Sequence, residues 1–387
     1  MLRSLVKRGF VTVAQAPPND ESHSAQEMIA KALILGTFVA YIFASVLSIR
    51  LQISYVYGQV IATLAIVEDP TVTAYITVDS GSDDPDAPLS EFNKDGNDRK
   101  IAEPELHLVR NRPITSSFRV TLRHLRARDG WTGPLRGAAL RVVYCFLVAA
   151  AAGLMSYFPR PVGGIIALVL FSRLDLAWNN IVISEGSSQY WFRRLPALRT
   201  WFKVLPAASL SAVADHLAVL LPTQLARMNG LKDLVDKVGR APPADDAERR
   251  AIVHALCRYG LAVVVVGLAV FILIQIPATV TLARVQASLL PDSEESIVPF
   301  DRSFGGKVVP EIIGGSGVVG MLDAWRSFGW SSRVRLLKLY AKVWAIQISL
   351  LVLFAVIFSA EVAYFMPEIA NTLRSMVTAT PVTVPAV

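Results

Sequence analysis

Long runs of apolar residues, separated by short polar and basic segments, dominate the 387-residue chain. A membrane-spanning helix needs about 20 mainly apolar residues, and six runs reach that length. They are residues 28–67, with room for an interfacial portion after Gln52, and residues 138–158, 162–184, 206–228, 251–276 and 339–365. Only Pro159-Arg160-Pro161 joins the second run to the third, which predicts a tight helical hairpin. The pattern therefore predicts an all-α integral membrane protein with six transmembrane helices.

A repeated unit is visible along these runs. Basic, partly amphipathic segments precede the second, fourth and sixth runs, at residues 116–128, 191–202 and 321–338. Each has a tryptophan near its end, namely Trp131, Trp201 or Trp330. Tryptophan alone is common at membrane interfaces, but a basic segment followed by an apolar run recurs each time, which indicates an internal repeat. We expect three pseudo-repeats that each contain two transmembrane helices and an amphipathic surface helix.

The repeats also predict the domain organisation. The expected segments are a basic tail at residues 1–27, repeats at 28–158, 159–229 and 250–367, a linker at 230–249, and a C-terminal tail at 368–387. The loop at 68–112 is acidic and rich in turn-forming residues, which is typical of a disordered insertion. The alternative for this loop is an acidic docking surface for a protein partner.

Composition and charge agree with a membrane location. The chain is 53% hydrophobic and 18% charged, whereas soluble domains are about 25% charged. The net charge of +7 comes from basic residues at the ends of apolar runs. Membrane orientation explains that placement, so no nucleic-acid partner is expected. The first ten residues carry three basic side chains, and no acid occurs before Asp20. This pattern is typical of a mitochondrial targeting segment, with a short cytosolic tail as the alternative.

The chain offers no arrangement typical of an enzyme. Cys145 and Cys257 both lie within apolar runs, without a disulfide framework or metal-ligand spacing. Asp215 and His216 are adjacent, so on a helix their side chains point about 100° apart and form a poor catalytic pair. We expect no enzymatic activity, no cofactor and no metal site.

Polar residues inside the apolar runs are the candidates for a functional site, because charge within a membrane is costly. The candidates for a substrate cavity are Arg141, Asp215, His216, Arg258, Lys342 and Gln347. Such a cavity suits a small anionic or zwitterionic molecule. The alternative is that Arg141, Arg258 and Lys342 extend toward lipid headgroups. Asp175 would then belong to a polar cluster that packs helices together, with Arg173, Asn179 and Asn180.

One motif stands where the first basic segment meets the second apolar run. It reads Asp129-Gly130, then a short gap, then Leu135-Arg136-Gly137. It resembles a motif of the mitochondrial carrier family, which has an acidic residue and Gly, then an aromatic residue or Leu, a basic residue and Gly. The resemblance implies six tilted helices with three-fold pseudo-symmetry around a central cavity, in a mitochondrial membrane.

A second motif at the end of the fifth run resembles the carrier signature of Pro, an acid, a base and then Arg-x-Gln. Pro277, Arg284 and Gln286 match this signature. Thr279 stands in the place of the acid, and Leu282 stands in the place of the base. In the carrier family these charges form a salt-bridge ring that closes the cavity on one side.

On the third run, Asp175 occupies the place of the acid in that signature, and Trp178 replaces the base. The loss of most ring charges leaves two main hypotheses. The chain moves a small solute through a carrier-like fold, or it keeps that fold as a non-transporting membrane scaffold. A cavity shared by Arg141, Asp215 and Lys342 would favour transport, whereas an apolar filling would favour the scaffold. A third hypothesis is an unrelated multi-span protein of the endomembrane system.

Overall fold

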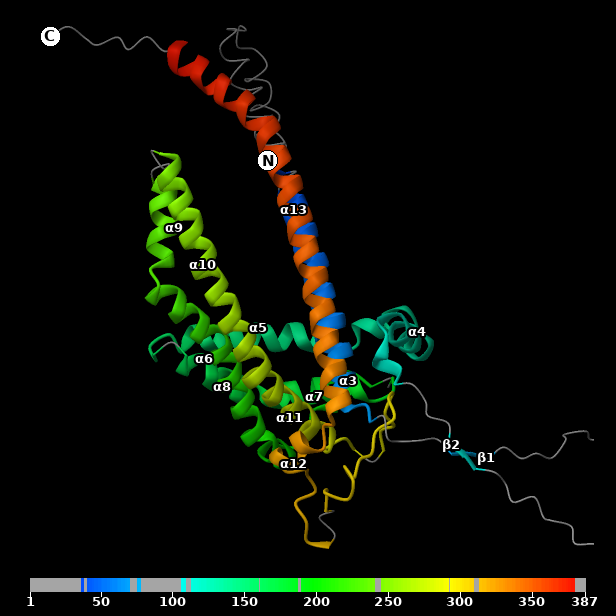
Figure 1. Cartoon of the computed structure of the whole chain (residues 1–387). Coiled ribbons are helices and arrows are strands. Elements are labelled where there is room, and N and C mark those ends of the chain that lie inside the picture. Colours follow the sequence, from blue (N-terminus) through cyan, green and yellow to red (C-terminus); the bar gives the residue numbers. More distant parts are fainter. Residues whose placement is uncertain are drawn as a thin grey trace, which may run out of the picture. The chain divides into compact units, whose positions relative to one another are not determined.

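The computed structural model describes residues 36–37, 40–69, 75–77, 106–108, 113–159, 161–186, 189–240, 245–291, 293–309 and 313–379. Within these ranges the chain is mostly helical (Figure 1). It divides into two compact units, Met1–Ser54 with Ala341–Val387, here called the terminal unit, and Tyr55–Tyr340, here called the central unit. The basic tail at 1–27 and the acidic residues of the loop, from Asp79 to Asp98, lie outside the described residues.

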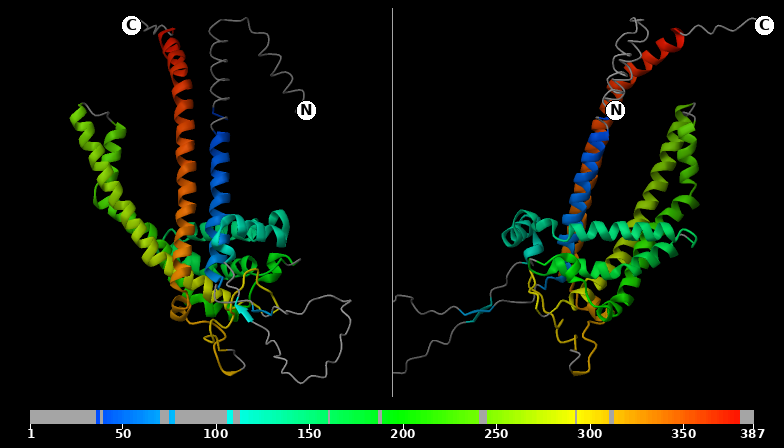
Figure 2. Two further views of the ribbon diagram at one scale, coloured as in Figure 1. Left: turned by 45° about the vertical axis from the view of Figure 1, so that its right-hand side comes forward. Right: turned by 180° about the vertical axis from the view of Figure 1, so that it is seen from behind.

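The terminal unit pairs the first part of helix Ala40–Val67 with most of α13 (Trp330–Ala379), as Figure 2 shows. Arg50 Nε donates to Gln347 Oε1 at 2.8 Å, and Gln347 Nε2 donates to the Arg50 carbonyl at 3.0 Å. The rings of Phe43 and Phe354 pack edge to face with centroids 6.2 Å apart. Polar groups therefore pair between the two helices.

The central unit holds the remaining elements. Its larger helices are η1 (Ser54–Val60, π-helical), α3 (Ile61–Val67), α4 (Phe118–Asp129), α5 (Ala138–Leu154), α6 (Val162–Leu170), α7 (Ser172–Ile183), α8 (Leu198–Met228), α9 (Leu231–Arg240), α10 (Asp246–Val270), η5 (Phe271–Gln275, π-helical), α11 (Ile276–Ala287) and α12 (Met321–Arg326). Three short 3₁₀ helices are η2 (Ile114–Ser116), η3 (Gly130–Leu135) and η4 (Trp191–Arg194). Strands β1 (Tyr75–Thr77) and β2 (Leu106–Leu108) pair antiparallel.

Among the described residues, five helices are long and apolar enough to cross a membrane, or up to six if one bent pair counts as a single span. The five are Ala40–Val67, Phe118–Leu154, Leu198–Met228, Asp246–Ala287 and Trp330–Ala360, and the bent pair is α6 with α7. Many of their apolar side chains are exposed, as a lipid environment allows. The chain thus has the helices of a multi-pass membrane protein. The arrangement of six spans in three repeats stays a prediction.

The expected hairpin between the second and third runs is present, because α5 packs against α6. A Cβ on Gly163 would lie 2.8 Å from the Met155 carbonyl oxygen, so the close approach requires glycine. The third run, however, is not the single helix expected at 162–184. It bends by 52° between α6 and α7, where the Ser172 hydroxyl donates to the Val169 carbonyl at 2.7 Å. Serine bonds of this kind compete with the helix and bend it.

The three basic segments take different forms. The first is the separate helix α4. In the second, η4 is followed by α8, which begins at Leu198 and continues into the apolar run. The third divides between α12 and the start of α13. The expected linker at 230–249 contains α9 and the beginning of α10. The first segment therefore forms a helix with its own bounds, whereas the other two continue into a long helix after at most a short one.

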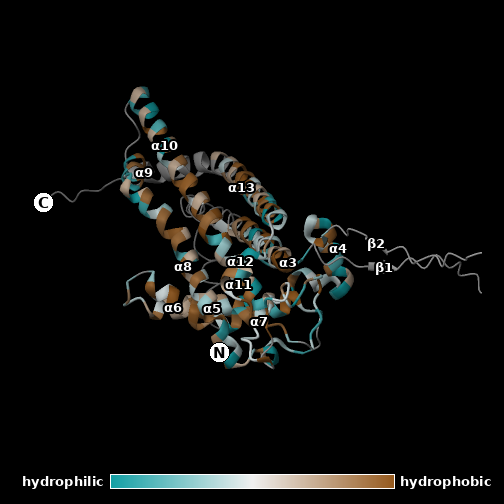
Figure 3. Ribbon diagram, turned by 60° about the horizontal axis from the view of Figure 1, so that its bottom comes forward, coloured by the Kyte–Doolittle hydropathy of each residue, from teal (hydrophilic) through white to brown (hydrophobic). Residues whose placement is uncertain are grey.

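Within the central unit, α5 and the α6–α7 pair run crosswise to α8 and α10 (Figures 1 and 2). Figure 3 shows hydrophobic stretches along α8 and α10. The main core forms where α3, α7 and α11 contact one another, and it contains Leu64, Ile183 and Val285, all at most 2% exposed. This core holds one side of a polar cavity in place.

Candidate functional site

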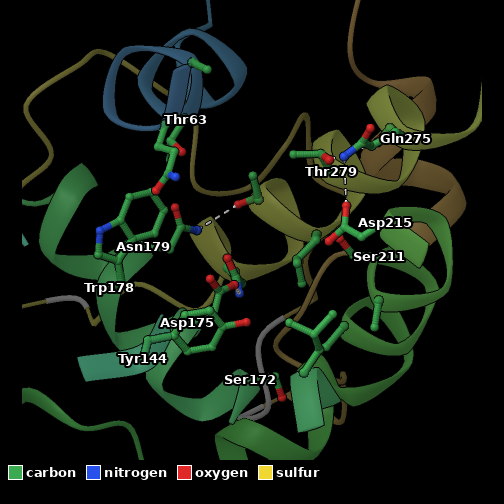
Figure 4. Close-up of a pocket in the computed structure, with 18 of the residues that line it drawn as sticks. Thr63, Tyr144, Ser172, Asp175, Trp178, Asn179, Ser211, Asp215, Gln275 and Thr279 are labelled. Atoms are coloured by element: carbon green, nitrogen blue, oxygen red, sulfur yellow. Dashed lines mark hydrogen bonds between the residues drawn. The ribbon is translucent and has the colours of Figure 1, made fainter. Parts of the chain in front are cut away.

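A cavity of about 570 Å³ lies within the central unit (Figure 4). Its walls come from η1, α3, α5, α6, α7, α8, η5 and α11, with Tyr340 from the start of α13. The side chains with polar atoms that line it include Gln59, Thr63, Arg141, Tyr144, Ser172, Asp175, Trp178, Asn179, Ser211, Asp215, Gln275, Thr279, Gln286 and Tyr340. The cavity is therefore polar although its walls are built from apolar runs.

Arg141 and Asp175 form the main ion pair of the cavity. Arg141 Nη1 donates to Asp175 Oδ1 at 2.8 Å, and Gln286 Nε2 donates to Asp175 Oδ2 at 2.9 Å. The guanidinium carbon lies 4.8 Å from the ring centre of Tyr144 and 4.9 Å from that of Trp178. Stacking on aromatic faces favours a planar cation, so the two rings and the carboxylate fix the position of Arg141.

Trp178 is in turn held by the carrier-like motif. Its Nε1 donates to the Tyr55 hydroxyl at 3.0 Å, and that hydroxyl donates to the Arg136 carbonyl at 2.5 Å. Gly137 follows with φ of +72°, a conformation that favours glycine. A Cβ there would lie 3.0 Å from the Trp178 ring. The motif therefore contributes to the cavity by supporting its wall.

Asp215 lies on α8, on another wall of the cavity. Its Oδ1 accepts a hydrogen bond from Gln275 Nε2 at 3.0 Å, as Figure 4 shows. Gln275 is the last residue of the π-helical turn η5, and such wide turns occur frequently at functional sites. Asp215 has no salt-bridge partner among the described residues, so its charge is not balanced within this part of the chain.

Two amide oxygens in the cavity wall lack partners among the described residues. Asn179 is 1% exposed, and its Nδ2 donates to the Ala283 carbonyl at 3.2 Å, but its Oδ1 accepts no hydrogen bond. The buried Oε1 of Gln59 also accepts none. A buried polar atom without a partner costs free energy, whereas water or a ligand in the cavity can satisfy it.

Some of the site residues predicted from the sequence line the cavity, and others do not. The cavity brings together Arg141, Asp175, Asp215 and Gln286. His216 is not among the lining residues. Its Nδ1 contacts the carbonyl of Ala212 on its own helix at 2.9 Å, and its ring lies beside Gly164 of α6. Arg258 stacks on the neighbouring Tyr259 of α10 and does not line the cavity either. Lys342 and Gln347 belong to the terminal unit.

The remaining motif residues have structural contacts. Pro277 stands in the first turn of α11, and its carbonyl accepts from the Thr281 hydroxyl at 2.7 Å. Arg284 is 4% exposed and donates to the carbonyl of Ile66 at 3.1 Å. Its guanidinium also stacks on Phe304. The end of the second carrier-like motif therefore ties α11 to the end of α3.

The first carrier-like motif forms a turn closed by an ion pair. Asp129 and Arg136 approach to 3.1 Å, and Arg136 Nη2 donates to the Ser184 carbonyl at 2.5 Å. Gly130 ends α4 with φ of +68°. This turn joins α4 to α5 and contacts the end of α7.

A buried ion pair near the end of α3 joins distant segments. Glu68 is 2% exposed and lies 3.2 Å from Arg335 Nη1. Its oxygens also accept from the backbone N–H groups of Ile114 and Thr115, at 2.5 and 3.2 Å, and from the Thr115 hydroxyl. Both carboxylate oxygens of Glu68 are therefore hydrogen-bonded.

Several cavity residues were not candidates at the level of sequence, among them Tyr144 and Gln275. A helical face provides the signal that was missed. Arg141, Tyr144, Cys145 and Val148 all line the cavity, and their spacing of three and four residues is that of one face of a helix. Gln275 and Thr279 are also four residues apart. Gln275 ends the π-helical turn η5, however, and this wider turn rotates the residues before it away from the face that a regular α-helix would present.

Searches against known protein families, curated proteins and solved structures found no match to this chain. The resemblance to mitochondrial carriers therefore rests on the motifs around Arg136 and Arg284. Among the described residues, no group of three or more His, Cys, Asp or Glu side chains is arranged to hold a metal ion.

Proposed function

We propose that this protein binds a small polar solute in the central cavity and moves it across a membrane through a divergent carrier-like fold. The observation that carries the proposal is the meeting of Arg141 and Asp215 in one cavity between long apolar helices, together with Asp175. Lys342, which was expected to share this cavity, is not among its lining residues. Charged side chains within membrane segments are costly and face cavities or substrate pathways. A polar chamber of this size suits a small molecule.

Two further observations support a carrier-like architecture. Arg136 and Arg335 stand at the same sequence distance after Trp131 and Trp330, in the first and third proposed repeats. Both arginines are paired with a carboxylate, at 3.1 and 3.2 Å. The basic, acid-free start of the chain and the carrier-like motifs favour a mitochondrial membrane. Protease protection on purified mitochondria, with antibody detection of the full chain, tests this location.

A non-transporting scaffold is the second candidate function. Thr279 and Leu282 both line the cavity but carry no charge, so a salt-bridge ring of the carrier type would be incomplete on α11. Transport in this protein would need other contacts to close the cavity. The polar lining favours transport, because a scaffold has no need of unpartnered buried oxygens.

Proteoliposomes that contain the purified full chain provide the test. Uptake of a panel of labelled anionic, zwitterionic and cationic small solutes is compared with uptake by protein-free vesicles. Ala149→Trp places a large ring at the cavity lining, whereas Val142→Trp places the same ring on an exposed position of α5 outside the lining. We expect uptake that Ala149→Trp reduces at least tenfold and Val142→Trp preserves. Absence of uptake for every solute would favour the scaffold.

A further inference from the structure

The charges that line the cavity do not balance. Among the described lining residues, Asp175 and Asp215 are acidic and Arg141 is the one base. Arg141 is already paired with Asp175 at 2.8 Å. The carboxylate of Asp215 is therefore the charge that the cavity leaves uncompensated, and a charge within apolar walls attracts a counter-charge.

The geometry of Asp215 leaves it open to a ligand. One oxygen, Oδ1, accepts from the Gln275 amide at 3.0 Å. The neighbours of Asp215 on the same face of α8 are Ser211 and Ala212, which are small and line the cavity. In Figure 4 the Asp215 carboxylate lies next to Gln275 at the cavity wall. Nothing among the described residues donates to its second oxygen.

An independent observation indicates a ligand that donates hydrogen bonds. Asn179 is 1% exposed and lines the cavity, and its Oδ1 has no donor among the described residues. The buried Oε1 of Gln59 lines the same cavity and also has none. Both are neutral acceptors on walls other than that of Asp215. The walls therefore offer more free acceptors than an anion could use, because an anion brings acceptors of its own.

We propose that the cavity binds a small molecule with a protonated primary amine, which is held by the carboxylate of Asp215. The three N–H groups of the ammonium can donate to Asp215 and to water, and a further donor of the ligand can reach the oxygens of Asn179 or Gln59. The ligand replaces the missing positive charge. This inference rests on the proposed function and narrows it, because it selects amines over simple anions.

The contacts of Arg141 distinguish two kinds of amine, one that also carries a carboxylate and one that is a simple cation. Its Nε is buried and has no acceptor among the described residues. A ligand that carries a carboxylate as well as the amine would satisfy this donor, whereas a plain organic cation would not. The protonated amine is common to both kinds, and the experiment separates them.

Thermal unfolding of the purified full chain in detergent tests the proposal with three probes of matched carbon number. Propylamine is a cation, β-alanine is a zwitterion and propionate is an anion at pH 7. A ligand that binds only the folded state stabilises it by RT ln(1 + [L]/Kd), so the melting temperature rises with the ligand concentration relative to its dissociation constant. We expect one or both amines at millimolar concentration, at constant ionic strength, to raise the melting temperature by several degrees. Propionate is expected to have no effect.

The matched variants are Asp215→Asn and Asp301→Asn. Asp301 lies in the central unit but does not line the cavity. The amine response should disappear in Asp215→Asn and persist in Asp301→Asn. An amine response that survives Asp215→Asn overturns the proposal, as does a response to propionate alone or to no probe. A larger shift with β-alanine than with propylamine identifies a zwitterion held also by Arg141.

A second measurement on the unaltered protein covers the case in which Asp215→Asn does not fold. Dicyclohexylcarbodiimide activates protonated carboxyl groups within membrane segments. The activated carboxyl then rearranges to an N-acylurea or reacts with an amine in solution to form an amide, with release of the urea. Mass spectrometry of the peptide that contains Asp215 therefore measures the fraction of unmodified Asp215, and both products count as modified. We expect propylamine or β-alanine to reduce modification of Asp215 at least threefold, and equal modification with and without amine contradicts the proposal. Uptake of anions alone, blocked by Ala149→Trp, would keep the transport function while removing the amine inference.

Discussion

Glu68 and Asp215 are both carboxylates in the central unit, but they differ in how completely their oxygens are used. Glu68 is 2% exposed and accepts from two backbone N–H groups, from the Thr115 hydroxyl and from Arg335. Asp215 accepts from Gln275 alone among the described residues. A buried carboxylate with full hydrogen bonding stabilises its surroundings, whereas one with unused oxygens costs free energy unless a ligand fills them. The first arrangement suits a structural role, and the second suits a binding site.

The local sequence explains part of the difference. Glu68 directly follows α3, at the end of an apolar run, where the first two residues of η2 supply N–H donors. Asp215 lies within α8, where every nearby N–H is used in the helix, and its cavity-facing neighbours are small. A carboxylate inside a helix depends on other elements for donors, and here η5 supplies one.

The largest expected effect is on stability and comes from Glu68→Ala. It leaves the Arg335 guanidinium buried without its carboxylate and removes the acceptor for two backbone donors. Breaking a buried ion pair costs about 3–5 kcal/mol, so we expect a large fall in the melting temperature in detergent. Glu185→Ala removes an exposed ion pair with Arg128 and should cost less than about 1 kcal/mol. Equal losses in the two variants would contradict a structural role for Glu68.

Gly137→Trp tests the wall of the cavity on the side of the carrier-like motif. The residue has φ of +72°, and its Cβ would meet Trp178 at 3.0 Å. A side chain in this conformation costs about 1–3 kcal/mol, and the clash adds to it. We expect reduced accumulation in the membrane, measured by immunoblot of the membrane fraction. Gly153→Trp is the control, because no atom lies within 4 Å of its Cβ position. Normal levels of Gly137→Trp would exclude a packing role for the motif.

A double-mutant cycle on Arg141 and Asp175 separates stability from binding. Arg141→Met should cost about 1–3 kcal/mol, because it leaves Asp175 without its charged partner. The double variant Arg141→Met with Asp175→Leu should recover most of that stability, since apolar replacements of ion pairs are tolerated. It should not recover solute uptake in proteoliposomes. If the double variant took up solute as fast as the unaltered protein, the ion pair of Arg141 and Asp175 would not be required for transport.

The pattern of apolar runs predicted the features that depend on local sequence. The lengths of the apolar runs predict long helices, and the prolines at 159 and 161 predict a hairpin between two of them. The structure has long apolar helices and contact between α5 and α6. The bend before Ser172 and the π-helical turns η1 and η5 were not predicted. They depend on how each helix packs against others, which hydropathy does not record.

The candidate site was predictable only in part. Arg141, Asp175 and Asp215 are recognisable because a charge inside an apolar run is unusual. Glu68 was not a candidate, since it stands at the end of a run and its partner Arg335 is remote in sequence. Asn179 was noted only as a packing residue, because an amide reveals an unpartnered oxygen only when its surroundings are known. Pairing across distant segments was therefore the information that the sequence lacked.

Asp215→Asn tests whether Asp215, unlike Glu68, is dispensable for stability. The amide keeps an oxygen for the Gln275 donor and removes a charge that no described residue balances. We expect the stability without ligand to stay within about 1 kcal/mol of the unaltered protein or to rise, because a neutral group is easier to bury. Chemical unfolding in detergent measures this. A loss as large as that of Glu68→Ala would show that Asp215 is structural instead.

Asp301 provides the smallest effect, because its oxygens are hydrogen-bonded but it lies in a loop near solvent. The Ser303 hydroxyl and the Ser303 and Gly305 backbone N–H groups donate to it at 2.7–2.8 Å. The Ser303 side chain and then the Gly305 N–H hold the pKa of Asp301 below its ordinary value. A lowered pKa in the folded state adds stability above the unfolded-state pKa of about 3.9, and this stability is lost as pH falls through the folded-state pKa.

The melting temperature of the unaltered protein should therefore exceed that of Asp301→Asn by a small, constant amount above about pH 5. The difference should shrink below about pH 4. If the difference in melting temperature between the two proteins grew toward acid pH, the loop would not stabilise the ionised carboxylate. The hydrogen bonds to Asp301, which is not buried, would then contribute no stability.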